Sequence, residues 1–294
     1  DRKFADRPEE DEEAYVEFQE PETFAIVPGA FKPPHVGHAD MVRRYATGDG
    51  VKKADKVYVV ISAPMNAHRT LRDGTIIDAD TSIALWRKLF PEVVNLPNVE
   101  FMKAPADMRS PITVAFKFIS DESRLPFEEG DTVMLGASNK LDKKGRPDWM
   151  RWNSIDKEKH VKPGIELLSG EETAVPAYER SDGGGFSAST MRDLISDLVD
   201  DPNNKKAYSE LIEFVPKDKI RALFDQLGKP VPTMAQNPVN ELTSGGGSMT
   251  GYSGERPLPS GSAKPKTKKP KGKKNENLAI MNEVMRLIME RGTF

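Results

Sequence analysis

Residues 24–38 read FAIVPGAFKPPHVGH, and this stretch decides the fold. The apolar run FAIV ends at a Pro-Gly pair, which predicts a short buried strand. Two further prolines stiffen the turn that follows, and helical spacing then extends from Ala39 to Tyr45. A strand, a stiff turn and a helix in this order indicate the first unit of an α/β fold, with the N-terminus of the helix facing the turn.

Apolar runs and helical periods alternate along the chain as far as about residue 230. Further strands are expected at residues 56–62, 99–103, 131–135 and 174–177, and helices at residues 80–90, 111–120, 187–199 and 216–227. Residues 137–160 are polar and without a clean period, so we expect a long loop there. The alternation predicts an α/β fold with a Rossmann-like, doubly wound parallel sheet of about five strands.

Composition indicates one core with solvated appendages. The 294 residues are 37% hydrophobic and 30% charged, and a net charge of -3 hides an acidic start and a lysine-rich end. We expect an acidic N-terminal extension at residues 1–22, a globular domain at 23–230, a Gly/Pro/Lys-rich linker at 231–276 and a C-terminal amphipathic helix at 277–294. The absence of cysteine excludes disulfides, thiolate metal sites and cysteine nucleophiles. No apolar run approaches the length of a membrane span, so no membrane contact is expected.

The turn before the first helix has the chemistry of a phosphate site. Gly29 allows a sharp exit from the strand, and the N-terminus of the helix attracts anions. His35 and His38 are three residues apart, which places both imidazoles on one side of the first helical turn. Gly37 keeps that side low enough for a phosphate to approach, and Lys32 adds positive charge nearby.

Residues 29–38, GAFKPPHVGH, resemble the GxFxPxHxGH signature of the nucleotidyltransferase superfamily. Members include nicotinamide-mononucleotide, phosphopantetheine and FMN adenylyltransferases, and glycerol-phosphate and choline-phosphate cytidylyltransferases. Residues 186–192, FSASTMR, are similar to the family's ISSTxxR element, with Phe186 at the isoleucine position and Ala188 where serine is common. The resemblance implies transfer of a nucleoside monophosphate from a nucleoside triphosphate to a phosphate-bearing small molecule, with release of pyrophosphate. It also implies Mg²⁺ carried by the triphosphate, with no metal ligand from the protein.

The motifs, together with strand ends on the same edge of the sheet, predict the site residues. The expected catalytic residues are His35, His38, Lys32 and Arg192. The expected nucleotide-binding residues are Gly29, Ala30, Phe31, Gly37, Gly136, Ser138, Phe186, Ser187 and Ser189. The expected acceptor-binding residues are Ser62, Arg69, Arg72, Trp149 and Trp152. Ser187 is a suitable helix N-cap, and Arg192 can neutralise the departing pyrophosphate.

Several alternatives stay open on the sequence. ATP with a nicotinamide-mononucleotide-type acceptor is favoured, and CTP is the alternative because Asn139 or Asp142 stands where an acidic residue is common. The middle of the chain most resembles the nucleotidyltransferase-like proteins of tailed bacteriophages, on residues 61–64, 82–86 and 110–111. The expected location is therefore the host cell cytoplasm, with association with the virion as the alternative.

A different class of function follows from the ends of the chain. The acidic start, the basic tail and the terminal amphipathic stripe, which suits a protein partner, are the grounds for the alternative of a virion or assembly component that uses the fold as a docked module. The lysine-rich tail suits weak, nonspecific contact with nucleic acid. A fragment of a class I aminoacyl-tRNA synthetase is set aside, because the chain is short and lacks a KMSKS-like loop.

Overall fold

The computed structural model describes residues 20–63, 69–105, 108, 110–120, 125–142, 144–181 and 185–236. Five parallel strands form the central sheet in the order β3-β2-β1-β4-β6. They are β1 (Thr23–Gly29), β2 (Lys56–Ile61), β3 (Val99–Lys103), β4 (Thr132–Leu135) and β6 (Glu166–Leu168). The strand order reverses between β1 and β4, and in open α/β sheets ligands bind at the carboxyl ends of strands beside such a switch point. The turn that begins after Gly29 leaves β1 at this place.

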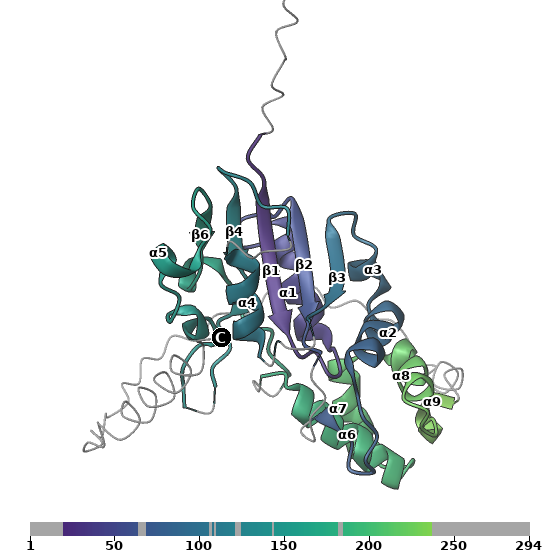
Figure 1. The fold of residues 1–294 in the computed structure, drawn as a ribbon. Helices are drawn as coiled ribbons and strands as arrows, with labels where there is room; N and C mark the ends of the chain where they lie inside the picture. The colour runs from purple at the N-terminus through teal and green to yellow at the C-terminus, as the bar shows by residue number, and fades with distance from the viewer. Residues whose placement is uncertain are drawn as a thin grey trace, which may run out of the picture. The chain divides into compact units, whose positions relative to one another are not determined.

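Helices cover both faces of the sheet. They are α1 (Val36–Thr47), α2 (Ala79–Leu89), α3 (Pro91–Val94), α4 (Pro111–Ile119), α5 (Lys157–His160), α6 (Ala188–Asp200), α7 (Lys205–Phe214), α8 (Ile220–Gln226) and α9 (Thr233–Gln236). Short 3-10 turns lie at η2 (Asp148–Trp152), η3 (Glu171–Thr173) and η4 (Lys217–Lys219). Figure 1 shows α4 on one face of the sheet and α1 on the other. This two-sided covering is the doubly wound arrangement expected from the sequence.

Each face has its own apolar core, and β1 contributes to both. Ala25 and Val27 pack with residues of α1, α2, α6, α7 and α8, whereas Phe24 and Ile26 pack with residues of α4 and β4. Successive side chains of a strand point to opposite faces, so a strand covered on both faces has an unbroken apolar sequence. The run FAIV therefore has the pattern of a central strand.

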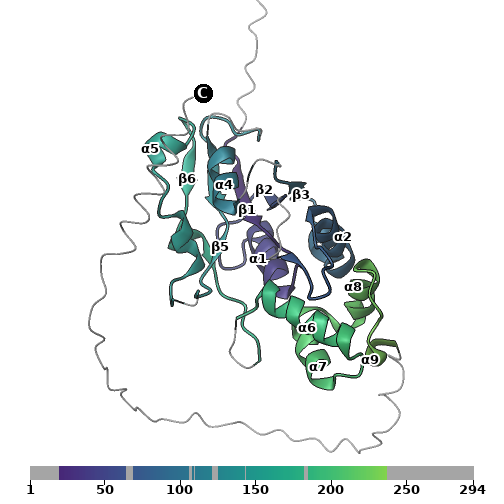
Figure 2. The same cartoon turned by 60° about the horizontal axis from the view of Figure 1, so that its bottom comes forward.

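Local signals set the helix ends. Asp78 accepts a hydrogen bond from the Thr81 amide at the start of α2, and Ser110 does the same for Thr113 at the start of α4. Helix α1 ends at Gly48, whose φ of +81° is in the left-handed region. Helices α6 and α7 lie side by side beyond the carboxyl ends of β1 and β2, as Figures 1 and 2 show. Two helices from later in the chain thus lie at the edge of the sheet where β1 and β2 end.

The expected fold class is confirmed, but the fifth strand is not the one expected. Strand β6 completes the sheet, whereas β7 (Ala174–Val175) pairs with β5 (Ala137–Ser138) in a separate two-stranded sheet. The expected long loop at residues 137–160 contains β5, η2 and α5. Strand β6 has only three residues, which is too short to show an alternating pattern. Helix α7 was not expected from the sequence.

The ends of the chain lie outside the described residues. These include most of the acidic extension, the lysine-rich segment after residue 236 and the segment where a C-terminal amphipathic helix is expected. Within the described ranges, no helix has the length and apolar character needed to cross a lipid bilayer.

Candidate active site

The turn between β1 and α1 is built around Phe31. This residue has φ of +49°, in the left-handed region that bulky side chains rarely adopt. Its ring lies over Gly29, where an added Cβ would be 2.5 Å from Phe31 Cζ. The Ser82 hydroxyl fixes the turn by donating to the Phe31 carbonyl at 2.5 Å. The sharp exit expected at Gly29 is therefore made by Phe31, and Gly29 leaves space for its ring.

The two imidazoles lie together at the start of α1, as their three-residue spacing predicts. The rings of His35 and His38 stack with centroids 3.6 Å apart and an interplanar angle of 21°. Phe31 packs edge-on against His38, and Phe186 lies 5.7 Å from the His35 ring. His35 is the N-cap residue of α1, although its side chain makes no capping hydrogen bond. The helix start and the imidazole pair therefore occupy the same place.

Both histidines are held uncharged. Burial, together with the nearby ammonium of Lys140, lowers the pKa of His38 to about 3. Burial, the neighbouring His38 and Lys140 lower the pKa of His35 well below its usual value. Both ring nitrogens of His35 and Nδ1 of His38 are buried without a hydrogen-bond partner in the protein. Buried polar atoms are normally paired, so these three nitrogens mark a position where a ligand would supply the missing partners.

A group of cations gathers beside the histidine turn. The Arg192 guanidinium, on α6, donates from Nη1 to the Lys32 carbonyl at 2.6 Å. Burial lowers the pKa of both Lys32 and Arg192, and the nearby charge of Arg69 lowers both further. The charge of Arg69 thus acts on both Lys32 and Arg192, while the carboxylates of Asp78 and Asp193 act in the opposite direction on Lys32 and Arg192 respectively. Lys32 itself is fully buried at 0% exposure, so its side chain is not available for direct contact at the surface.

The start of α6 is open. Ser187 occupies the N-cap position, but its hydroxyl bonds to the hydroxyl of Ser189 at 2.7 Å and makes no capping hydrogen bond. Ser187 is therefore at the N-cap position, as expected, but without the side-chain hydrogen bond that makes serine suitable there. The first-turn amides of a helix of this length carry partial positive charge and bind anions when no side chain caps them.

Phe186 connects this helix start to the histidines. Its buried ring packs against His35 and Phe214, and the ring of Tyr178 lies 5.3 Å away. Tyr178 is 46% exposed and its Cβ lies 3.5 Å from the position that a Cβ on Gly37 would take. Neither Tyr178 nor Lys140 was selected from the sequence. No motif marks Tyr178, whereas Lys140 directly follows the Gly136 to Asn139 loop and could have been chosen for its charge there.

The residues after β4 pack tightly against β1. The Gly136 amide donates to the Ile26 carbonyl at 2.7 Å, and a Cβ on Gly136 would be 2.9 Å from Val27 Cγ2. Arg151 Nη2 donates to the Gly136 carbonyl at 2.8 Å. Packing against β1 thus explains the glycine at this position. Ser138 lies half-buried in β5, two residues further along.

The expected acceptor-binding residues do not all lie together. Ser62 is buried beside the turn, with its amide donating to the Gly29 carbonyl, and Arg69 belongs to the cation group. Arg72 instead pairs with Asp197 on α6, with Nη1 and Oδ1 2.5 Å apart. Trp152 is 1% exposed in the core under β4, and Trp149 packs against the same core. A stacking surface for an acceptor is therefore not formed by Trp152 in this structure.

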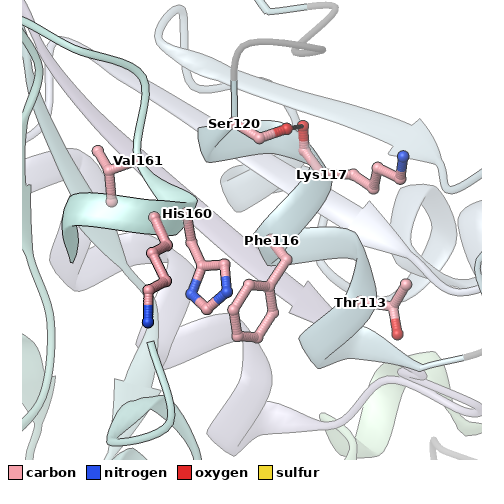
Figure 3. Close-up of a pocket in the computed structure, with 7 residues that line it drawn as sticks. Thr113, Phe116, Lys117, Ser120, His160 and Val161 are labelled. Atoms are coloured by element: carbon pink, nitrogen blue, oxygen red, sulfur yellow. Dashed lines mark hydrogen bonds between the residues drawn. The ribbon is translucent and has the colours of Figure 1, made fainter. Parts of the chain in front are cut away.

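A separate pocket lies between α4 and α5 (Figure 3). It has a volume of about 370 Å³ and is lined by Thr113, Phe116, Lys117, Ser120, Lys159, His160 and Val161. His160 packs edge-on against Phe116, and its Nδ1 accepts from the Asp156 amide at 3.0 Å. None of the expected site residues lines this pocket. His160 therefore has a structural contact here, as a lone histidine usually does.

The side chains at the histidine turn suit anionic oxygens better than a metal ion. Within the described residues, no group of three or more His, Cys, Asp or Glu side chains could hold a metal. Mg²⁺ prefers carboxylate, phosphate and water oxygens, whereas this place presents imidazoles, ammonium and guanidinium groups. The described residues do not fit a magnesium site made by the protein.

Comparisons with known proteins give matches only among solved structures. No family model matches the chain, and no curated protein matches it. A provisionally named nicotinate-nucleotide adenylyltransferase from Vibrio parahaemolyticus is 12% identical, over 65% of this chain and 91% of that chain, with a TM-score of 0.33. The Plasmodium falciparum nicotinic acid mononucleotide adenylyltransferase complexed with APC is 8% identical, over 70% and 94%, with a TM-score of 0.34. At these values no residue correspondence can be drawn, so every role below is argued from this chain's own residues.

Proposed function

We propose that this protein is a nucleotidyltransferase that transfers a nucleoside monophosphate, from ATP in the first instance, to a phosphate-bearing acceptor of the nicotinamide-mononucleotide type. One observation carries the proposal. The stacked pair of His35 and His38 lies at the start of α1, and Arg192 from α6 reaches the same turn by donating to the Lys32 carbonyl. Neutral donors and a cation group in one place suit a polyphosphate more than any other common ligand.

The proposed reaction is a single displacement. A phosphate oxygen of the acceptor attacks the α-phosphorus, and the bond from that phosphorus to the bridging oxygen of the leaving group breaks. The electron pair of that bond goes to pyrophosphate, and no proton has to be taken up by the protein. Such transfers need charge stabilisation and alignment, so the protein supplies no nucleophile.

The histidines and the cations have different parts in this reaction. A neutral imidazole has one N–H, so His35 and His38 each donate one hydrogen bond to oxygens on the α-phosphate. The positive charge comes from Lys32, Arg69 and Arg192 and stabilises the negative charge that grows on pyrophosphate. The first-turn amides of α6, left without a side-chain cap, can hold the same end of the chain. Mg²⁺ is expected to arrive on the triphosphate, where it would neutralise part of the phosphate charge.

Pyrophosphate release tests the proposal. The full chain is incubated with each nucleoside triphosphate, ATP and CTP included, together with nicotinamide mononucleotide, phosphopantetheine or glycerol phosphate. We expect turnover with ATP and nicotinamide mononucleotide, and a loss of about 100-fold or more in His38→Ala, because the variant lacks a donor to the reacting phosphate.

A matched control separates chemistry from folding. His160→Ala removes a histidine that packs on Phe116 far from the turn, and it should keep the turnover of the wild type. Turnover with CTP in place of ATP would move the proposal to a cytidylyltransferase. If no triphosphate and acceptor give turnover above the His38→Ala background, the enzyme proposal is lost.

A further inference from the structure

Lys140 bridges two segments that meet at the histidine turn. Its backbone is fixed two residues after β5, because the Asn139 amide donates to the Val175 carbonyl and the Asp148 amide donates to the Lys140 carbonyl. Its ammonium donates to the carbonyl of Phe186, the second residue before α6. Its stem runs over Gly185, where an added Cβ would be 3.1 Å from Lys140 Cε. The ammonium is thus held at the residue that precedes the N-cap of α6.

The same ammonium lies beside the imidazole pair. Phe186, which receives its hydrogen bond, has its ring 5.7 Å from the ring of His35. After burial, the charge of Lys140 is among the causes that lower the pKa of both histidines, so its field reaches both rings. Lys140 is itself half-buried, and burial lowers its own pKa. The carboxylate of Asp148 raises that pKa but does not outweigh burial, so a further anionic partner would stabilise the ammonium.

An ammonium has three donors, and the Phe186 carbonyl accounts for one of them. The cation group of Lys32, Arg69 and Arg192 lies where Arg192 meets the Lys32 carbonyl. Lys140 approaches from another segment, through Phe186, on the side of the histidine rings. One polyphosphate could therefore be bound by the cation group along part of its length and by Lys140 next to the imidazoles.

We propose that Lys140 is a direct ligand of the polyphosphate, binding the phosphate oxygens next to His35 and His38 while its stem holds the start of α6 in place. The inference rests on the proposed function, because it names a further ligand of the same site. Lys140 supplies the positive charge that the two neutral imidazoles lack. The bound phosphate accepts hydrogen bonds from the N–H groups of the ammonium that do not bond to the Phe186 carbonyl.

Binding of sodium tripolyphosphate and of ATP to the full chain, measured by calorimetry, tests this role. Lys140→Gln is the informative variant, because its amide can still donate to the Phe186 carbonyl while the charge is gone. We expect Lys140→Gln and Lys140→Met to bind both ligands about ten- to a hundredfold more weakly, as for the loss of a charged hydrogen bond. Lys140→Arg keeps the charge and should bind within a few-fold of the wild type.

Two controls make the result specific. Lys144→Met removes an exposed lysine of the same loop and should leave both affinities unchanged. The deficit of Lys140→Gln should shrink between about 0.05 and about 0.5 M salt, because screening weakens charge effects and leaves a purely structural defect in place.

The outcomes separate this inference from the proposed function. If Lys140→Gln binds tripolyphosphate as the wild type does, Lys140 is only a tether and the inference is overturned. If the wild type itself binds neither tripolyphosphate nor ATP, the proposed function is wrong, whatever the Lys140 variants do. Lys140→Met failing to fold would leave Lys140→Gln, which keeps the tether, as the deciding variant.

Discussion

At the scale of single residues, the uncharged state of the histidines couples the site to stability. His38 stays neutral in the folded protein down to about pH 3, whereas in the unfolded chain it takes up a proton near its ordinary pKa of 6.5. The unfolded chain therefore binds more protons between these values, and stability rises with pH across this window. His35 acts in the same direction.

We predict that the unfolding free energy falls as the pH is lowered from 6.5, by about 1.4 kcal/mol per pH unit for each buried imidazole. Above pH 6.5 this contribution is fully present. Urea unfolding at a series of pH values measures the slope, and His38→Gln should reduce it by about half. Carboxylates act in a lower window, since a hydrogen bond from Lys229 lowers the pKa of Asp73 from 3.8 to about 2. A flat stability profile between pH 5 and 6.5 would show that the histidines are not buried as described.

Arg192 contributes both a hydrogen bond and a positive charge at the histidine turn, and one substitution removes both. Arg192→Met removes the donor to the Lys32 carbonyl and one charge of the cation group. We predict that tripolyphosphate binds about ten- to a hundredfold more weakly and that the melting temperature falls. Arg221→Met, on the exposed side of α8, is the matched control and should change neither quantity. Calorimetry and thermal unfolding measure both, and unchanged affinity in Arg192→Met would remove Arg192 from the site.

Residue spacing predicted some of this geometry and missed the rest. A spacing of three residues places His35 and His38 on one side of the first helical turn, so their proximity was expected, whereas the stacking of the rings was not. The contact of Lys140 with Phe186 joins positions 46 residues apart, and no local pattern reveals it. The burial of Trp152 likewise depends on how the loop after β4 folds back, which periodicity does not encode.

At the scale of elements, the start of α6 lacks the stability that a side-chain cap would add. The hydroxyl of Ser187 bonds to that of Ser189 and leaves the first-turn amides without a cap. An aspartate is a stronger cap and interacts favourably with the helix dipole. The same carboxylate would repel a phosphate at this position.

We predict opposite effects of Ser187→Asp on stability and on binding. The unfolding free energy should rise by about 0.5–1 kcal/mol, while tripolyphosphate should bind at least about fivefold more weakly. Asn204, which accepts from the Ala207 amide at the start of α7, provides the contrast. Asn204→Ala should cost about 1 kcal/mol and leave binding unchanged. If Ser187→Asp binds tripolyphosphate as tightly as the wild type, the start of α6 does not face the ligand.

The elements that sequence predicted well are those with long, clean patterns. Strand β3 has the predicted bounds. The observed ends of β1, β2 and α2 lie no more than two residues from the predicted ones. Strand β6 has only three residues. It pairs with β4, which lies more than 30 residues earlier in the chain. Strand β7, with the apolar sequence Ala-Val, pairs with β5 instead, so apolar character alone did not show which segment completes the sheet.

At the scale of the whole molecule, one buried hydroxyl joins helix α1 to the small β5-β7 layer. Tyr45 is fully buried on α1, and its hydroxyl accepts from the Ala137 amide at 3.0 Å and donates to the Thr173 carbonyl at 2.5 Å. Burial raises the pKa of this hydroxyl to about 12. Helix α1 begins at the histidine pair and β5 leads to Lys140, so Tyr45 connects the two sides of the candidate site.

Tyr45→Phe should therefore lower the stability of the protein without changing its binding of tripolyphosphate. The substitution leaves the Ala137 amide and the Thr173 carbonyl buried with one partner fewer, at a cost of about 1–3 kcal/mol. Thermal unfolding should show a melting temperature lower by about 2–10 °C. The rise in melting temperature with saturating tripolyphosphate should persist, because the hydroxyl contacts only the protein backbone. Tyr178→Phe, at a tyrosine 46% exposed, is the matched control and should melt like the wild type. An unchanged melting temperature in Tyr45→Phe would mean that the β5-β7 layer is not held to α1 by this hydroxyl.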